Sequence, residues 1–167
     1  MFCRRSQGRG SGDPYFKDSC YFISTAEEGQ TWAQNRATCK VKGGDLVSIE
    51  TKEEWKFIRD QIQKKCIGQP NEWHIGLKNG DNGWKWVNGK PLTFCKWQVT
   101  AGEPSGDGNV VVMSKDFPTL KKGLFNDLSE ALFRAYICEI PKGKAITEHN
   151  ESLYVLLEMA DDRFSSN

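Results

Sequence analysis

The sequence lacks long apolar runs and a visible export signal. No segment approaches the ~18 consecutive apolar residues of a membrane-spanning helix, so no span is expected within this chain. Residues 1–14, MFCRRSQGRGSGDP, are polar and glycine-rich and do not form the apolar centre of a signal peptide. Because they contain turn formers without an apolar period, they are predicted to be a flexible leader.

Charge of one sign, histidine and closely spaced cysteines are also scarce. Lys and Arg number 23 against 22 Asp and Glu, and the net charge of +1 gives no broad attraction to nucleic acid. Of the two histidines, His74 lies in an apolar segment and His149 near the C-terminus, so no histidine cluster is expected for metal binding or base catalysis. No cysteines have the C-x-x-C spacing typical of zinc sites. These absences argue against a nucleic-acid-binding protein, a zinc protein and an enzyme.

Six widely spaced cysteines are present, and an even number of this kind is typical of a disulfide framework formed in an oxidising compartment. They are Cys3, Cys20, Cys39, Cys66, Cys95 and Cys138. Their spacing alone does not choose among the pairings. An exported chain without a signal peptide implies an incomplete N-terminus, a mature fragment or free cysteines, and we favour the incomplete N-terminus.

A chain of 167 residues suits one globular domain with tails. The domain is predicted to occupy residues 15–141. Residues 142–167 are predicted to be a polar tail that is disordered or marginally helical. The tail contains an N-glycosylation sequence at 150–152, which has meaning only if the chain is exported.

The first helix is predicted from a capping box. Residues 31–34, TWAQ, have the S/T-x-x-Q spacing of a helix start. After it, Ala33, Ala37 and Val41 recur at helical spacing. The glycine pair at 43–44 ends this helix, because glycine favours the backbone conformation that terminates helices.

A second capping box, TKEE at residues 51–54, predicts a second helix after the short apolar link DLVSI at 45–49. Trp55, Ile58 and Ile62 follow at the spacing of one helical face. This helix is expected to bury that face and to run to about Lys65.

Short β-branched and aromatic segments predict strands, most of them in the second half of the chain. Asn88-Gly89 readily adopts the positive φ angles of a tight turn and is the clearest hairpin signal. Early helices and late antiparallel strands predict an α+β domain rather than a parallel βαβ array. The predicted strands are DSCYFIS (18–24), WHIGL (73–77), GWKWV (83–87), PLTFCKW (91–97), NVVVM (109–113) and AYICEI (135–140).

The order of these segments resembles the C-type lectin-like domain family over about residues 20–140. The resemblance rests on SCYFIS, ATCKVKGGDLVSIETKEEWKFI, WHIGL, GEPS, FND and YICEI, which occur in the family's order. It implies a C-type lectin-like fold in which two helices flank small antiparallel β-sheets. It also implies a long irregular ligand-binding loop between WHIGL and the last strands.

The resemblance implies a disulfide between Cys39 and Cys138. At the two positions of the family's second disulfide this chain has Val110 and Glu130, so that bridge is expected to be absent. Several pairings of the other four cysteines remain open. The pairs that we predict are an N-terminal bridge found in longer family members and a bridge particular to this chain: Cys3 with Cys20, and Cys66 with Cys95.

GEPS and FND resemble the EPN and WND motifs that bind calcium and sugar in the family's lectins. Ser105 replaces the asparagine of EPN with a shorter, poorer calcium ligand. Gly108 aligns with a downstream acidic ligand, and the adjacent Asp107 is expected to substitute. The expected metal ligands are Glu103, Ser105, Asp107, Asn126 and Asp127. The expected sugar-binding residues are Glu103, Ser105, Asn126 and Asp127.

The resemblance therefore implies an extracellular carbohydrate-binding module with weak calcium binding and glycans or glycoproteins as ligands. Glu103 before the proline implies mannose-type sugars. The alternative is a calcium-independent, protein-binding domain of the same fold, which the fold alone does not distinguish. Trp84, Trp86 and Trp97 are expected to pack in the core rather than stack on a sugar ring.

Overall fold

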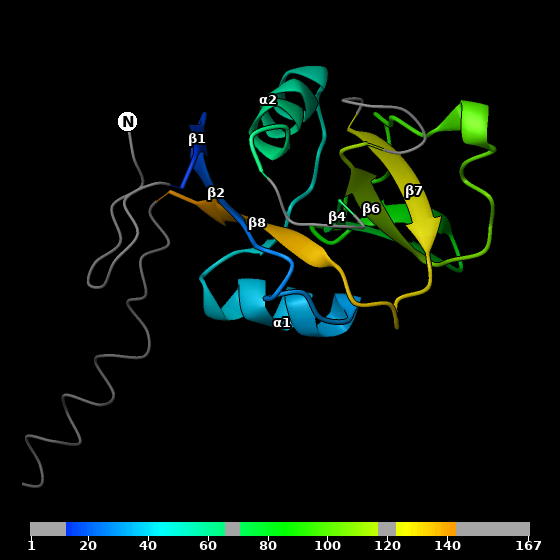
Figure 1. The fold of residues 1–167 in the computed structure, drawn as a ribbon, viewed down its shortest axis with the longest axis horizontal. Coiled ribbons are helices and arrows are strands. Elements are labelled where there is room, and N and C mark those ends of the chain that lie inside the picture. Colours follow the sequence, from blue (N-terminus) through cyan, green and yellow to red (C-terminus); the bar gives the residue numbers. More distant parts are fainter. Residues whose placement is uncertain (1–12, 66–70, 117–122, 143–167) are drawn as a thin grey trace, which may run out of the picture.

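The computed structural model describes residues 13–65, 71–116 and 123–142. Helices α1, Trp32–Val41, and α2, Lys52–Ile62, lie on opposite sides of strands β2, Ser19–Ile23, and β8, Ala135–Pro141 (Figure 1). This arrangement confirms the predicted α+β class. Residues 1–12 of the predicted leader and residues 143–167 of the predicted tail, including the sequence at 150–152, lie outside the described residues.

The strands form one sheet in the order β1-β2-β8-β4-β6-β7, with β3 added to β8 and β5 added to β4. β4 and β8 run parallel, whereas the other pairs are antiparallel. Neither helix in the described ranges has the length and apolarity needed to cross a bilayer. The remaining strands are β1, Tyr15–Phe16; β3, Asp45–Leu46; β4, Glu72–Gly80; β5, Gly83–Trp86; β6, Val110–Ser114; and β7, Leu124–Leu128.

Helix α1 begins with the predicted capping box. The Thr31 hydroxyl accepts a hydrogen bond from Gln34 N, and Thr31 N donates to the Gln34 side chain at 3.2 Å. The side of the helix that faces the core is Trp32, Asn35 and Cys39. The residues predicted at helical spacing, Ala33, Ala37 and Val41, are exposed.

Helix α2 buries the predicted face of Trp55, Ile58 and Ile62, and it ends at Ile62, slightly short of the prediction. Only half of its capping box forms. Thr51 Oγ1 accepts from Glu54 N at 3.2 Å, but the Glu54 carboxylate accepts from Glu50 N at 3.0 Å and from Tyr21 Oη at 2.9 Å. The carboxylate is drawn away from the cap because it satisfies a buried tyrosine.

Strand β6 explains why the run NVVVM is apolar on consecutive residues. Val111 and Met113 belong to the core cluster of α2, whereas Val110 and Val112 belong to the cluster that contains Trp32. Both faces of the strand are therefore buried, as in the middle of a layered domain.

The predicted strand at 91–97 does not form. The turn at Gly89 exists, with a φ of 87°, but one isolated bridge from Lys85 to Pro91 follows it. Proline has no N–H to continue a ladder. Leu92 and Phe94 instead pack against the main core cluster.

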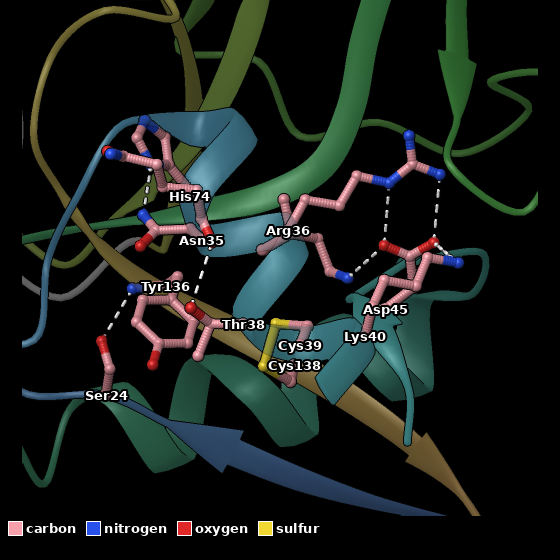
Figure 2. The surroundings of a disulfide bond; sticks show 12 residues. Ser24, Asn35, Arg36, Thr38, Cys39, Lys40, Asp45, His74, Tyr136 and Cys138 are labelled. Carbon is pink, nitrogen blue, oxygen red and sulfur yellow. Dashed lines mark hydrogen bonds and ion pairs between the residues drawn. A yellow bond between two sulfur atoms is a disulfide. The ribbon is translucent and has the colours of Figure 1, made fainter. Parts of the chain in front are cut away.

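The predicted Cys39–Cys138 disulfide is confirmed, and it joins α1 to β8 across 99 residues of sequence (Figure 2). Beside it, Asn35 Nδ2 donates to Nδ1 of the fully buried His74 at 2.9 Å. Burial, with a smaller contribution from Arg134, lowers the pKa of His74 to about 3. The imidazole is thus a neutral acceptor in the core rather than a metal ligand.

The predicted bridge between Cys66 and Cys95 is wrong, because Cys95 is a free, exposed thiol. Leu92 and Phe94 pack inward, and alternation along this extended segment points Cys95 to solvent. Cys66 lies outside the described residues. Cys20 is disulfide-bonded, but Cys3 is outside the described ranges, so the Cys3–Cys20 pair stays a prediction.

Candidate ligand-binding site

The loop of residues 102–109 lies between the short 3-10 helix η1, Val99–Ala101, and β6. The segment before it runs along the outer edge of β7. Gln98 N donates to Phe125 O at 3.1 Å, and Phe125 N donates to Lys96 O at 2.7 Å. The Glu103–Pro104 peptide is cis. These contacts fix the start of the loop relative to the FND segment.

Aromatic packing supports the loop from the core side. The Trp97 ring lies 5.1 Å from Trp84 and 6.1 Å from Phe125, measured between ring centroids. Trp86 is 2% exposed and contacts Phe125 edge-on. Trp86 is therefore a core residue as expected, and Trp84 and Trp97 are partly buried and pack against the same core cluster.

Asp127 of β7 is the centre of the polar contacts of the loop. Its carboxylate is 1% exposed and accepts backbone N–H bonds from Ser105 at 2.8 Å, Gly106 at 3.0 Å and Gly108 at 3.2 Å. Ser105 N also donates to Glu103 Oε2 at 3.0 Å. Neighbouring amides aimed at one anion form a concave anion-binding turn. The anion in this turn is a side chain of the protein itself.

The two carboxylates titrate differently. Burial and the hydrogen-bonded Asp127 carboxyl raise the pKa of Glu103. Burial also disfavours ionisation of Asp127, but its hydrogen bonds to Glu103 and to the three backbone amides hold the pKa of Asp127 below its usual value. As the pH falls, Glu103 therefore takes up a proton before Asp127 does. The hydrogen bonds from the backbone amides keep the Asp127 carboxylate charged.

The structure brings together three of the five predicted metal ligands: Glu103, Ser105 and Asp127. Asp107 is exposed, and Asn126 has no hydrogen bond to this group. Asn126 precedes Asp127 in a regular strand, where successive side chains point to opposite faces. Within the ranges that the structure describes, no group of three or more His, Cys, Asp or Glu residues is placed to hold a metal ion.

Gly108 shows why the predicted calcium set does not assemble. A Cβ at this position would lie 2.0 Å from the carbonyl carbon of Leu128, so the loop approaches β7 too closely for any side chain. The acidic ligand that the family has at this position has no room here. The residues present therefore do not fit the calcium site that the resemblance implies.

Two features of the site were missed by sequence reasoning. LFNDL was not predicted as a strand, because its two consecutive polar residues hide the alternation of β7. Gln98 is 0% exposed, and neither its amide nitrogen nor its amide oxygen has a hydrogen-bond partner in the described part of the chain. A glutamine in a loop gives no sequence signal of this burial.

An ion pair is found where the family's second disulfide is absent. Val110 is buried, as expected for a position on the core side of β6. The Glu130 carboxylate instead accepts a hydrogen bond from Lys78 Nζ at 2.6 Å. Lys78 is the register partner of Val110. The strands at this end are thus joined by a partly exposed salt bridge.

Known proteins match this chain over most of its length. The family model for the lectin C-type domain matches residues 28–140. C-type lectin domain family 4 member E of Mus musculus is 31% identical over 136 residues, covering 77% of this chain and 58% of the relative. The Homo sapiens protein of that name is 32% identical over 147 residues, covering 79% and 61%. The chain spans less than two thirds of the length of these relatives.

Solved structures share the fold. The cow CD23 carbohydrate-recognition domain, determined in the presence of a GlcNAc2Man3 oligosaccharide, has a TM-score of 0.62 and 26% identity, covering 80% of this chain and 96% of that chain. The Ca2+-independent C-type lectin SPL-2 from Saxidomus purpuratus has a TM-score of 0.67 and 25% identity, covering 78% and 92%. Family members are carbohydrate- or protein-binding receptors, so the prediction that the domain is not an enzyme is confirmed. The chain belongs to the C-type lectin-like domain family.

Proposed function

We propose that this domain is an extracellular carbohydrate-binding module that recognises glycans or glycoproteins through residues 102–109 without calcium. The observation that carries the proposal is the Asp127 carboxylate, which accepts three backbone N–H bonds from the loop. Calcium takes roughly six to eight oxygen ligands. Asp127 already uses its lone pairs, and Gly108 offers no side chain.

The loop retains groups that bind sugars directly. Glu103 is half-buried, and Ser105 is exposed. Together they offer donors and acceptors of the kind that pair with sugar hydroxyls. The likeness to the Ca2+-independent lectin SPL-2 supports binding by this fold without the ion.

A second candidate is a calcium-dependent lectin for mannose-type sugars, as the Glu103-Pro104 sequence implies. One observation favours it: the Glu103 and Asp127 carboxylates both accept from Ser105 N, at 3.0 and 2.8 Å. Two carboxylates that share one amide would gain from a nearby cation. The two candidates differ in whether calcium changes the protein at all.

The test is retention on immobilised mannose-type glycans, with calcium and with EDTA, together with the melting temperature in both conditions. The proposal predicts retention and melting that do not change with EDTA, because a ligand stabilises the fold only if it binds. Glu103→Ala should weaken retention, whereas Asp60→Ala on the exposed face of α2 should not. Calcium-dependent melting and retention would favour the second candidate. Failure to retain any glycan would favour a protein ligand.

A further inference from the structure

A groove of about 420 Å³ lies between α1 and the β4–β5 hairpin. This volume is within the ~300–1,000 Å³ that small-molecule sites occupy. None of residues 102–109 lines it, so the groove is separate from the candidate site above. Among its described lining residues, the cations are Arg36, Lys78 and Lys85, and the one acid is Asp81.

Two of these cations face each other across the hairpin. Lys78 of β4 and Lys85 of β5 are direct register partners, so their side chains lie on the same face of the sheet. Like charges placed directly opposite destabilise a strand pair. Lys78 is neutralised by Glu130, with Nζ 2.6 Å from the carboxylate. Lys85 is exposed and makes no salt bridge within the described ranges, so its charge is uncompensated.

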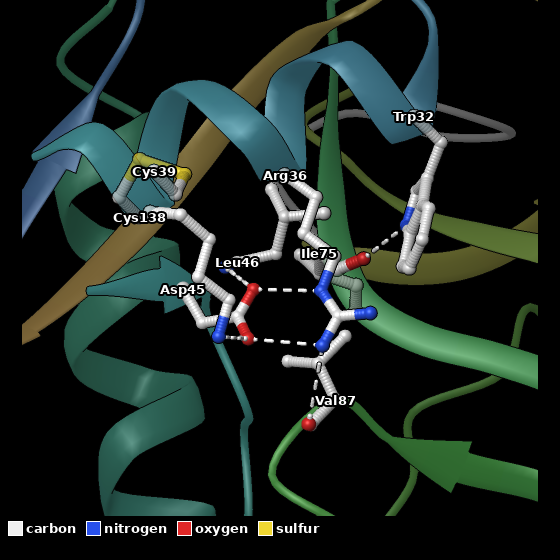
Figure 3. A network of polar contacts seen from close by, with 9 residues as sticks. Trp32, Arg36, Cys39, Asp45, Leu46, Ile75, Val87 and Cys138 are labelled. Atoms are coloured by element: carbon white, nitrogen blue, oxygen red, sulfur yellow. Dashed lines mark hydrogen bonds and ion pairs between the residues drawn. A yellow bond between two sulfur atoms is a disulfide. The ribbon is translucent and has the colours of Figure 1, made fainter. Parts of the chain in front are cut away.

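Arg36 adds a positioned guanidinium to the same groove. Its Nε and Nη2 atoms donate to the two oxygens of Asp45 at 3.0 and 3.1 Å, and Nη2 also reaches Val87 O at 3.5 Å (Figure 3). Nη1 has no hydrogen-bond partner in the described part of the chain. Asp45 thus fixes the orientation of the guanidinium and leaves one edge free to donate.

Trp32 holds two of the cations in place. The guanidinium carbon of Arg36 lies 5.7 Å from the centre of a Trp32 ring, and Lys78 Nζ lies 5.1 Å from it. The indole is 4% exposed and donates to Ile75 O at 2.9 Å, so it cannot rotate freely (Figure 3). Cations held over a fixed ring lose little freedom when an anion binds.

We propose that this groove binds a sulfate group of a sulfated saccharide. Lys85 and the free edge of Arg36 supply the charge-assisted donors that an oxyanion needs. The groove is larger than one oxyanion, and the exposed Asn82 at its rim offers an amide to saccharide hydroxyls. An anion in the groove would also compensate the charge of Lys85.

The test measures binding of a heparin-derived oligosaccharide, its desulfated counterpart and inorganic sulfate to the full chain by calorimetry. The sulfated saccharide should bind and weaken with added salt. Lys85→Glu should weaken it about tenfold or more, because it removes a charge-assisted contact. It should not lower the melting temperature, because Lys85 is exposed and makes no salt bridge within the described ranges. Lys56→Glu, the same charge change on the exposed face of α2, is the matched control.

Several results would overturn the proposal. Equal losses in Lys85→Glu and Lys56→Glu would show attraction to overall charge only. Equal binding of the desulfated saccharide would exclude sulfate recognition, and inorganic sulfate as tight as the saccharide would reduce the groove to a simple oxyanion site. If Lys85→Glu does not fold, Lys85→Gln should still lose affinity while it keeps the wild-type melting temperature or exceeds it. These outcomes do not depend on calcium or on Glu103, so they separate this proposal from the function proposed for residues 102–109.

Discussion

The region beneath α1, where this helix packs on the sheet, and the loop of residues 102–109 are stabilised in different ways. Beneath α1, a buried disulfide and the Asn35–His74 hydrogen bond lie among apolar side chains. In the loop, backbone bonds join its two ends to Gln98 and Leu128, and the amides of its middle part donate to a single carboxylate, that of Asp127. One region is held by many buried contacts, and the middle of the other depends largely on one charged residue.

The difference indicates how this domain divides stability from binding. The disulfide of the α1 region fixes this helix to β8, the last described strand. The loop keeps its shape through amide contacts, so its exposed side chains are free to contact a ligand. We expect changes beneath α1 to alter stability, and exposed changes on the loop to alter recognition.

The largest effect should come from the disulfide. The double variant Cys39→Ser/Cys138→Ser opens a closed loop with a sequence separation of 99 residues. The chain-entropy model assigns about 4.7 kcal/mol to a loop of that size, and removal of a native bridge typically costs about 2–5 kcal/mol. Urea denaturation should report this loss. Cys95→Ser, which alters a free exposed thiol, should leave the free energy of unfolding unchanged.

The next effect should be found at the loop, and it tests whether one carboxylate is enough to hold it. Asp127→Ala removes the acceptor of three backbone N–H groups, of which that of Ser105 keeps a second acceptor, Glu103 Oε2. Each unsatisfied buried group costs roughly 1–3 kcal/mol, but the loop is near solvent and water will replace part of the loss. We expect a loss of about 1–3 kcal/mol that is equal in calcium and in EDTA. Asp107→Ala should change stability by less than ~0.5 kcal/mol. A loss seen in calcium alone would contradict the amide-held loop.

An effect that is smaller for each pH unit should appear in acid and should belong to the α1 region. The pKa of His74 falls from 6.5 to about 3 on folding, so between these values the unfolded chain binds a proton that the folded chain does not. The contribution of His74 to the free energy of unfolding is fully present above pH 6.5, and it decreases as the pH falls toward about 3. The slope is at most about 1.4 kcal/mol per pH unit. His74→Gln should remove this part of the slope, and unchanged slopes in the two proteins would show that His74 titrates normally.

The smallest effect should be that of Ser105→Asn. This change restores the amide that the family's calcium motif contains, but Gly108 and the occupied Asp127 carboxylate still leave the ion too few ligands. We expect a stability change below ~0.5 kcal/mol and no heat on calcium titration. Calcium binding by this variant would mean that Ser105 alone accounts for the missing site, and it would favour the second candidate function.

Local signals in the sequence were sufficient for much of the fold. The capping box at Thr31 and the apolar face of α2 follow from short-range spacing, and the structure confirms both. The apolar spacing that predicted α1 does not mark its buried side, because that side includes Asn35, a polar residue that hydrogen-bonds to His74, 39 positions away. A hydrophobic period cannot reveal a polar residue that a distant partner stabilises.

The candidate site was predicted only in part for a similar reason. The motifs identified Glu103, Ser105 and Asp127 as neighbours, although they are up to 24 positions apart in the sequence. The predicted set of calcium ligands is incomplete at Gly108, where the loop approaches Leu128 too closely for a side chain. This approach is set by the placement of the backbone, which the motifs do not reveal. The bridge between Cys66 and Cys95 was predicted wrongly for the same reason, since the direction of the Cys95 side chain depends on how residues 91–97 leave the sheet.

The close approach of Gly108 to Leu128 also bears on how such a loop changes during evolution. A single substitution of Gly108 by Asp or Glu would place Cβ against the β7 backbone, 2.0 Å from the carbonyl carbon of Leu128. The variant would lose the loop conformation before it gained a ligand. A descendant of this domain would first need an insertion that lengthens the loop and lifts it from the strand. Point mutation alone therefore gives this lineage no direct route to the calcium site of its relatives.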